Sequence, residues 1–339
     1  MTNGSVVGKR VAIVGGAGFV GHHLALRLQE AGAEPYLVDS LQVNNLGAFS
    51  APSADGRNLH YLDFIHERLE LLRTQGIPLH VVDARDYSGL VRAFTHISPD
   101  VVVHLAAVAH AGRANKDPFS TFDHNSRTLE NALDASRDGG IQFIYFSSSM
   151  VYGDFGASEV SEDDLCEPIG IYGALKYGGE KLVIAYQQVF DLPFTIIRPS
   201  ALYGERCVSR RVGQAFIENA LGGLPLMVDG DGSDALDFTY VQDLVAGVVC
   251  CIGNEQAHNE VFNMTFGESR SLREMIGILK EQIPDLEVEY KDRDALMPKR
   301  GTLSVAKARE LVGYKPSWPL EVGLVRYLDW YRERSRVNG

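Results

Sequence analysis

The stretch Phe146-Ser-Ser-Ser-Met-Val-Tyr-Gly153, followed by Tyr172-Gly-Ala-Leu-Lys176, decides the fold that we expect for this chain. The apolar run 141–146 is typical of a buried strand in a parallel sheet, so the serines stand at its carboxyl end. The segment 171–190 lacks proline and is rich in Ala, Leu, Lys, Glu and Gln, which predicts a helix. Chemistry in doubly wound folds takes place at the carboxyl ends of the strands. We therefore predict an α/β fold with a doubly wound parallel sheet and reactive groups at that edge.

Tyr172 and Lys176 lie one turn apart on one face of this helix. A phenol titrates near pH ~10, so it is a poor base at neutral pH unless a cation such as Lys176 favours the phenolate. The hydroxyl of Ser148 could bind the same substrate oxygen and share the proton. A second pair on the helix, Tyr177 and Lys181, has the same spacing on another face. We predict Ser148, Tyr172 and Lys176 as the catalytic residues because a loop, a strand end and a glycine-rich turn accompany them.

A glycine-rich turn follows the first apolar strand, which we expect at 11–14. Such a turn between strand and helix lets the backbone approach a pyrophosphate, which lies on the positive end of the helix. A tight turn without a ligand is the alternative, and the position between strand and helix argues against it. The pattern predicts a Rossmann-type dinucleotide site. The contacts we expect in it are Gly15, Gly18, Phe19, Val20 and Gly21.

An acidic residue ends the next expected strand, 36–39. Asp39 stands about 20 residues after the glycines, the interval at which a carboxylate reaches the ribose hydroxyls of NAD. The same carboxylate would repel the additional phosphate of NADP. The alternative is that Asp39 only caps a turn. We predict NAD as the cofactor.

Composition excludes several classes of protein. The 339 residues suffice for one large α/β domain with a smaller one attached. The net charge of −12 argues against nucleic acid and anionic membranes as partners. No apolar run has the length of a membrane span and the amino terminus is short and polar, so we expect a cytoplasmic protein. The cysteines have neither disulfide nor metal-site spacing, so no metal is expected: Cys166, Cys207, Cys250 and Cys251.

The motif Ser-Ser-Ser-Met-Val-Tyr-Gly followed by Tyr-Gly-Ala-Leu-Lys-Tyr-Gly-Gly-Glu resembles the extended short-chain dehydrogenase/reductase family, the nucleotide-sugar epimerases and dehydratases. The resemblance extends over nearly the whole chain. It implies an NAD-binding Rossmann domain at 1–200 and a mainly substrate-binding α/β domain at 201–339. Part of 236–265 is expected to return to the first domain. The resemblance also implies a nucleotide-sugar substrate and a homodimer.

The resemblance assigns further positions one by one. An acidic residue after the third expected strand contacts adenine in the family, and small residues after the fourth let the chain pass close to the cofactor. The matching residues here are Asp83, Ala84, Leu105, Ala106 and Ala107. The following loop resembles a His-x-x-Arg motif that lies near the sugar in the dehydratases. Its residues here are His110 and Arg113; a solvated Arg113 is an equally good interpretation.

Two departures from the family affect the expected diphosphate site. Many relatives have Asn at the position of Ala201 and Arg at the position of Leu236, so a hydrogen bond and a charge are missing here. Guanidinium groups suit phosphate oxygens, so nearby arginines could compensate. They could equally be surface charges on the flank of a helix. These residues are Arg206, Arg210 and Arg211.

A further departure bears on the reaction. The related dehydratases carry an acid pair directly after the catalytic hydroxyl, because elimination of water needs a second acid and base. Here these positions are Ser149, a candidate substrate contact, and Met150. We therefore expect a nucleotide-sugar epimerase that acts at C4 of the hexose and retains NAD. A 4-ketoreductase or 4-dehydrogenase, a decarboxylase or dehydratase of the same family, and a dinucleotide-binding regulator without turnover are the alternatives.

Overall fold

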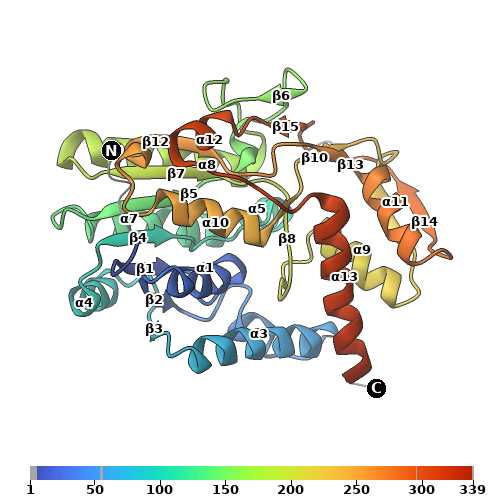
Figure 1. Cartoon of the computed structure of the whole chain (residues 1–339), viewed down its shortest axis with the longest axis horizontal. Helices are drawn as coiled ribbons and strands as arrows, with labels where there is room; N and C mark the ends of the chain where they lie inside the picture. The colour runs from blue at the N-terminus through green and yellow to red at the C-terminus, as the bar shows by residue number, and fades with distance from the viewer. Residues whose placement is uncertain (1–5, 54–55, 295, 338–339) are drawn as a thin grey trace.

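A seven-stranded parallel sheet forms the centre of the molecule (Figure 1). The computed structural model describes residues 6–53, 56–294 and 296–337, without the side chains of 335–337. The strands are arranged in the order β12-β7-β5-β4-β1-β2-β3. The direction of winding reverses between β1 and β4, as expected for a doubly wound sheet. The strands are β1 (Arg10–Val14), β2 (Glu34–Asp39), β3 (Leu79–Val81), β4 (Val101–His104), β5 (Gln142–Phe146), β7 (Phe194–Arg198) and β12 (Glu260–Asn263). The predicted fold class is confirmed.

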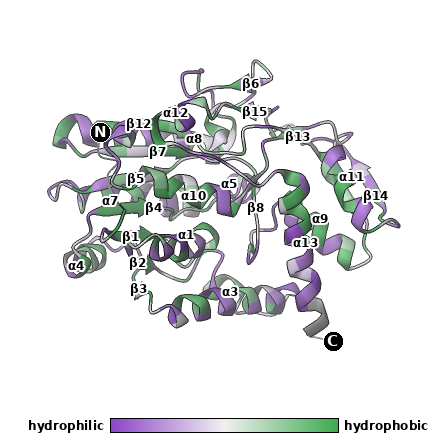
Figure 2. Cartoon of the chain, in the orientation of Figure 1, coloured by the Kyte–Doolittle hydropathy of each residue, from purple (hydrophilic) through white to green (hydrophobic). Residues whose placement is uncertain are grey.

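Helices cover both faces of this sheet. One layer contains α1 (Phe19–Glu30) and α10 (Val241–Cys251), which pack against each other and against apolar side chains of β1. The other contains α4 (Tyr87–Ile97), α7 (Thr128–Asp134) and α8 (Gly170–Phe190). Because both faces are covered, β1 and β4 are almost continuously apolar, as Figure 2 shows.

A smaller part with its own apolar core lies beside the carboxyl edge of the sheet (Figure 1). Its main helices are α9 (Val212–Leu221), α11 (Leu272–Gln282) and α13 (Leu320–Val337). Its parallel strand pair is β9 (Leu226–Asp229) with β14 (Val288–Lys291). Short pairs join it to the rest: β6 (Glu159–Val160) with β15 (Thr302–Leu303), β8 (Leu202–Tyr203) with β11 (Thr239–Tyr240), and β10 (Ala235–Leu236) with β13 (Arg270–Ser271).

The segment 241–263 joins the large sheet rather than the smaller part. Strand β12 pairs in parallel with β7, and α10 packs on α1. Helix α12 (Ala306–Val312) also packs against β12. The chain thus crosses between the two parts more than once, and we propose a first domain of residues 1–200 completed by part of 236–265.

The long connection after β2 contains α2 (Leu46–Phe49) and α3 (Arg57–Thr74). Helix α3 crosses to the smaller part, where Phe64 packs on Trp330 of α13 with ring centroids 4.7 Å apart. Figure 1 shows these two helices side by side. The sequence carries no signal of this contact, because the two partners lie near opposite ends of the chain.

The remaining elements are short helices around the pocket described below. They are α5 (Ala111–Lys116), α6 (Pro118–Phe122), a π-helical turn (Asp123–Arg127) and two 3-10 turns (Ser149–Val151 and Glu255–Ala257). The π turn has no clear sequence signal. Strand β4 ends at His104, after which Leu105, Ala106 and Ala107 line the pocket.

Candidate active site

A pocket of about 450 Å³ opens at the carboxyl ends of the sheet strands and extends toward the smaller part. The sheet contributes the residues that follow β1, β2, β4, β5 and β7. The smaller part contributes residues around β9, β10 and the segment 293–300. The size is typical of a site for a small organic ligand. This is the edge of the sheet at which the sequence predicts the reactive groups.

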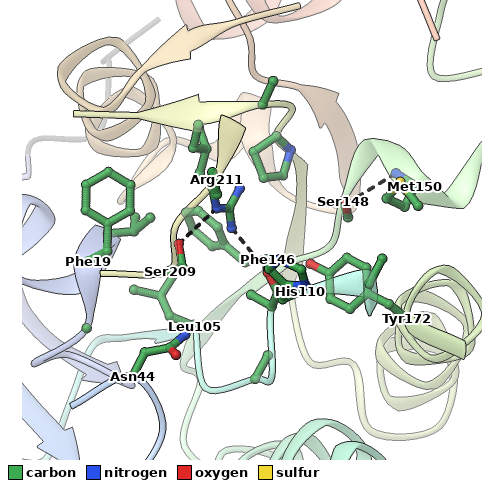
Figure 3. A pocket seen from close by; sticks show the side chains of 18 of the residues that line it. Phe19, Asn44, Leu105, His110, Phe146, Ser148, Met150, Tyr172, Ser209 and Arg211 are labelled. Atoms are coloured by element: carbon green, nitrogen blue, oxygen red, sulfur yellow. Dashed lines mark hydrogen bonds between the residues drawn. The ribbon is translucent and has the colours of Figure 1, made fainter. Parts of the chain in front are cut away.

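Ser148, Tyr172 and Lys176 all line this pocket and are nearly buried (Figure 3). Ser148 follows β5 and begins the 3-10 turn, where its Oγ accepts the N–H of Met150 at 3.2 Å. Helix α8 approaches this turn closely because residue 173 is glycine: a Cβ there would stand 2.7 Å from the carbonyl oxygen of Met150. The tight approach brings the phenol of Tyr172 beside the hydroxyl of Ser148.

The pKa of Tyr172 reflects three influences. Burial raises it above the ordinary value of a phenol, while the charge of Arg211 and the interaction with the Ser148 hydroxyl lower it. Figure 3 shows the Arg211 side chain reaching toward the loop that holds His110, beside Tyr172. The sequence interpretation assigned the lowering to Lys176. In this structure the charge of Arg211 acts on the phenol, and a contribution of Lys176 stays a prediction.

Lys176 is held at the end of β5. Its Nζ donates a hydrogen bond of 2.6 Å to the carbonyl oxygen of Phe146 and lies 5.0 Å from the ring centroid of Tyr145. Burial lowers the pKa of Lys176 to about 7. The carboxylate of Glu180, one turn later, has the opposite influence and raises this pKa. The ammonium is therefore fixed to the end of β5, two residues before Ser148.

The glycine-rich turn is shaped for a close approach of backbone and ligand. Gly15 has a φ of +84°, and a Cβ there would meet the backbone nitrogen of Ala106 at 2.8 Å. Helix α1 begins after Gly18 without a side-chain cap, so the N–H groups of its first turn are available to an anion. Phe19, Val20 and Gly21 line the pocket with them. This cradle fits a pyrophosphate.

Asp39 lies at the end of β2, beside this turn. One carboxylate oxygen accepts the N–H of Ala17 at 3.0 Å and the other that of Leu41 at 2.7 Å. Burial raises its pKa, while these two hydrogen bonds lower it. The carboxylate thus both shapes the turn and faces the pocket, where its remaining lone pairs suit ribose hydroxyls.

The other predicted cofactor contacts also line the pocket: Asp83, Ala84, Leu105, Ala106 and Ala107. The carboxylate of Asp83 is not free, because Arg85 binds it at 2.6 Å and bridges to Asp123 at 3.0 Å. These ion pairs lower the pKa of Asp83.

Comparison with known proteins places these observations in a family. The model of the NAD dependent epimerase/dehydratase family matches residues 11–265, which include the glycine-rich turn, Ser148, Tyr172 and Lys176. The chain belongs to this family. Its cofactor is NAD, and the cradle at Gly15 and the carboxylate of Asp39 fit that dinucleotide.

Similar proteins cover nearly the whole chain. The UDP-glucose 4-epimerase of Mycolicibacterium smegmatis is 30% identical, with 96% of this chain and all of that protein covered. The crystal structure of the UDP-glucose 4-epimerase of Thermotoga maritima with UDP-glucose is 26% identical, covers 96% of this chain and 99% of that one, and has a TM-score of 0.82. The crystal structure of the UDP-glucuronic acid 4-epimerase of Bacillus cereus in complex with UDP-glucuronic acid and NAD is also 26% identical. It covers 96% of this chain and 99% of that one, with a TM-score of 0.83.

The predicted substrate residues of this family member separate into two groups. His110, Ser149 and Arg211 line the pocket. Arg206 and Arg210 do not belong to the lining: the first pairs with Glu67 and the second with Glu218. Arg206 and Arg210 are thus engaged by carboxylates, and compensation for the missing diphosphate ligands stays a prediction.

Arg113 also lies outside the lining. Its Nη1 donates to the side chain of Asn44 at 2.7 Å. Its charge still acts on the site. Burial, the charge of Arg211 and the charge of Arg113 all lower the pKa of His110.

The structure adds residues that the sequence interpretation missed. Arg293 and Arg300 line the pocket, as do Ala201 and Leu236. Arg293 pairs with Asp234 at 2.9 Å, whereas the Nε of Arg300 is buried and has no hydrogen-bond partner in the structure. Burial and the charge of Arg211 lower the pKa of Arg300 to about 10. The only sequence signal was a basic pair, Lys299 and Arg300, in a segment without periodicity.

Arg68 of α3 is a further addition. It is fully buried, lines the pocket and donates through Nε to the carbonyl oxygen of Arg206 at 3.0 Å. The connection between β2 and β3, to which the sequence assigned no role, therefore forms part of the pocket wall.

No helix of the described segments is long and apolar enough to cross a membrane. The described residues also hold no cluster of His, Cys, Asp and Glu suited to a metal ion.

Proposed function

We propose that this protein is an NAD-dependent nucleotide-sugar epimerase that inverts C4 of a hexose through a transient 4-keto sugar. One observation carries the proposal: Ser148, Tyr172 and Lys176 meet in one pocket with the glycine-rich turn. The two similar structures that contain UDP-sugars, and the 30% identical UDP-glucose 4-epimerase, support a nucleotide sugar as substrate.

The proton chemistry follows from the three side chains. Tyr172 takes the proton of the C4 hydroxyl, and Ser148 binds the same oxygen as it becomes a carbonyl. Lys176 would hold the nicotinamide ribose. Bound NAD would supply the hydride acceptor for C4, and its reduced form would supply the hydride donor to the other face of the sugar. No net oxidation results, so the cofactor stays in place between turnovers.

The pocket suits a sugar that must turn between the two transfers. Its wall near Tyr172 includes the small residues Ala109 and Ala111, which pack in one cluster with Tyr172. Small side chains leave room for the keto sugar to present its other face without dissociation.

Dehydration is the reaction least suited to this pocket. The positions after Ser148 are Ser149 and Met150, both buried in the 3-10 turn, and neither side chain is a carboxylic acid. Elimination across C5 and C6 requires an additional acid and base, which these two side chains do not supply.

The test is to incubate the purified protein, without added cofactor, with UDP-, GDP-, CDP- and dTDP-sugars and to resolve the products. We expect an isomer of unchanged mass from at least one of them. A product that forms only with added NAD or NADH and differs by two hydrogens would make the enzyme a net oxidoreductase. Release of carbon dioxide would make it a decarboxylase.

We also propose a homodimer. Large apolar side chains are exposed on α6, where Phe119 is 87% and Phe122 54% accessible. Helix α6 contacts α8, whose Val189 and Phe190 are exposed as well. Exposed aromatic side chains on adjacent helices are typical of helix-to-helix contacts between subunits.

A further inference from the structure

Arg68 is a buried cation that the proposed proton chemistry does not use. It stands on α3, which packs against α1 (Figure 1), and its side chain is fully buried and lines the pocket. Within the described part of the chain no carboxylate forms an ion pair with Arg68, whereas Arg73 of the same helix and Arg206 each have one. A buried charge without a counter-charge is costly, and burial accordingly lowers the pKa of Arg68.

The hydrogen-bond donors of this guanidinium are only partly used. Nε and Nη2 both donate to one acceptor, the carbonyl oxygen of Arg206, and Nη1 donates to the carbonyl oxygen of Asn44 at a long 3.4 Å. Both acceptors are neutral, so neither compensates the charge. Because a guanidinium has five N–H groups, donors remain for an anionic ligand in the pocket.

The contact with Asn44 holds Arg68 near the glycine-rich turn. The next residue, Asn45, is fully buried, and its Nδ2 donates to the carbonyl oxygen of Ala17 at 3.0 Å. Ala17 belongs to the glycine-rich turn, and its own N–H is bound by the carboxylate of Asp39. The charge of Asp39 raises the pKa of Arg68, as expected for a carboxylate on the same side of the pocket.

The contact with Arg206 leads to the same turn by a second route. The Nε of Arg206 donates to Nε2 of His22 at 2.9 Å, and Nδ1 of His22 lies 2.8 Å from the carbonyl oxygen of Gly18. Because Nε2 accepts a hydrogen bond, Nδ1 carries the proton and donates to Gly18. Arg68 is thus tied from two directions to the turn at which α1 begins.

We propose that Arg68 binds the diphosphate of NAD, which makes the connection between β2 and β3 part of the cofactor site. The first turn of α1 offers neutral N–H groups to this diphosphate, and Arg68 adds a full positive charge and a planar fork of donors. The bound diphosphate in turn supplies the counter-charge that the buried guanidinium lacks. This inference concerns the cofactor, so it does not depend on which sugar the enzyme converts.

The experiment compares the binding of ADP and adenosine, which differ only in the diphosphate, to the cofactor-free protein. Both ligands displace NADH, and the fall in NADH fluorescence gives dissociation constants for the cofactor site. The variant is Arg68→Gln, which removes the charge and keeps an N–H donor for the carbonyl oxygen of Arg206. We expect ADP and NAD to bind about 10- to 100-fold more weakly to it, since one charged contact is lost, and adenosine to bind as it does to the native protein.

Three controls separate this contact from a general loss of structure. Arg73→Gln removes an exposed cation of α3 that pairs with Glu70, and it should change neither dissociation constant. Arg68→Lys retains the charge without the planar fork, and it should weaken ADP less than Arg68→Gln does, again without an effect on adenosine. UDP, titrated by calorimetry in the presence of saturating NAD, should bind equally well to Arg68→Gln and to the native protein.

Every outcome decides the role of Arg68. Equal losses for ADP and adenosine would mean that the side chain only shapes the pocket wall, and unchanged affinity for ADP would mean that it touches no phosphate; both overturn the inference. Weaker binding of UDP with unchanged ADP would place Arg68 at the substrate and overturn it as well. If Arg68→Gln does not fold, as judged by circular dichroism, the ratio of the two losses in Arg68→Lys decides by the same criterion. Failure of the native protein to epimerise any nucleotide sugar would refute the proposed function and leave these binding results standing.

Discussion

The ammonium of Lys176 donates a 2.6 Å hydrogen bond to the carbonyl oxygen of Phe146, the last residue of β5. This bond joins helix α8 to the end of the strand, two residues before Ser148. It also places a cation in a buried environment that lowers its pKa to about 7. The reactive groups are therefore positioned by two adjacent elements that pack closely.

Replacement of Tyr172 by Phe should lower kcat by about 10²–10⁴-fold, since it removes the proton acceptor. Bound NAD should remain, because the backbone cradle at Gly15 and the carboxylate of Asp39 are unchanged. Product analysis measures the first effect, and the absorbance of nucleotide released on denaturation measures the second. Tyr177→Phe, in the second Tyr-Lys pair on another face of α8, is the matched control and should retain activity. Normal turnover by Tyr172→Phe would refute the assignment.

Lys176 should make the stability of the protein depend on pH. Its pKa falls from the ordinary ~10.4 to about 7 on folding, so between these values the unfolded chain binds a proton that the folded protein does not. The free energy of unfolding contributed by this group therefore rises with pH from about 7 to ~10 and is constant below 7. Glu180 opposes the effect, and His104, with a pKa of about 3, stays neutral throughout.

The measurement for this prediction is urea unfolding of the cofactor-free protein and of Lys176→Met between pH 6 and pH 10. The difference between the two free energies should increase in favour of the native protein above pH 7. A difference that does not vary with pH would show that the ammonium keeps its ordinary pKa.

Glu180 should be important for stability. Its carboxylate pairs with Arg198 at 2.7 Å, and both side chains are almost fully buried. Removal of one member of a buried pair leaves the other charge uncompensated, so Glu180→Gln should cost about 3–5 kcal/mol of unfolding free energy. The exposed pair of Glu70 and Arg73 provides the control: Glu70→Gln should have a much smaller effect, because solvent screens exposed ion pairs. Equal effects in urea titrations would contradict the role of burial.

Phe119→Asp should shift the protein from dimer to monomer in sedimentation velocity, because it places a charge in the proposed contact of α6 and α8. Leu59→Asp, at a 64% exposed position of α3, should leave the dimer unchanged. A native protein that sediments as a monomer at micromolar concentration would refute the proposal.

The predictable parts of this protein are the local ones. The strand before Gly15, the turn itself and the helix after it lie within one short segment, so their residue types alone specify them. The same holds for Tyr172 and Lys176, whose spacing places them on one face of any helix. Ser148 could be added because parallel strands end at one edge of a sheet.

The arginines show where such reasoning ends. Arg206, Arg210 and Arg211 belong to one loop and have the same chemistry, so the sequence offered no way to choose among them. Glu67 of α3 binds Arg206, and Glu218 of α9 binds Arg210, which leaves Arg211 to the pocket. These partners come from different segments of the chain, and pairing over such separations leaves no local pattern.

The sequence by itself thus determined the doubly wound fold and the NAD turn, and it predicted the proton-transfer residues, since each depends on neighbours within a turn of helix or on the period of a strand. Only the tertiary structure showed that the charge of Arg211 acts on the phenol of Tyr172. It alone also brought Phe64 of α3 onto Trp330 of α13 and added Arg293 and Arg300 to the pocket lining. The physical reason is that charge and packing act through space, and the elements that meet at this pocket are distant along the chain.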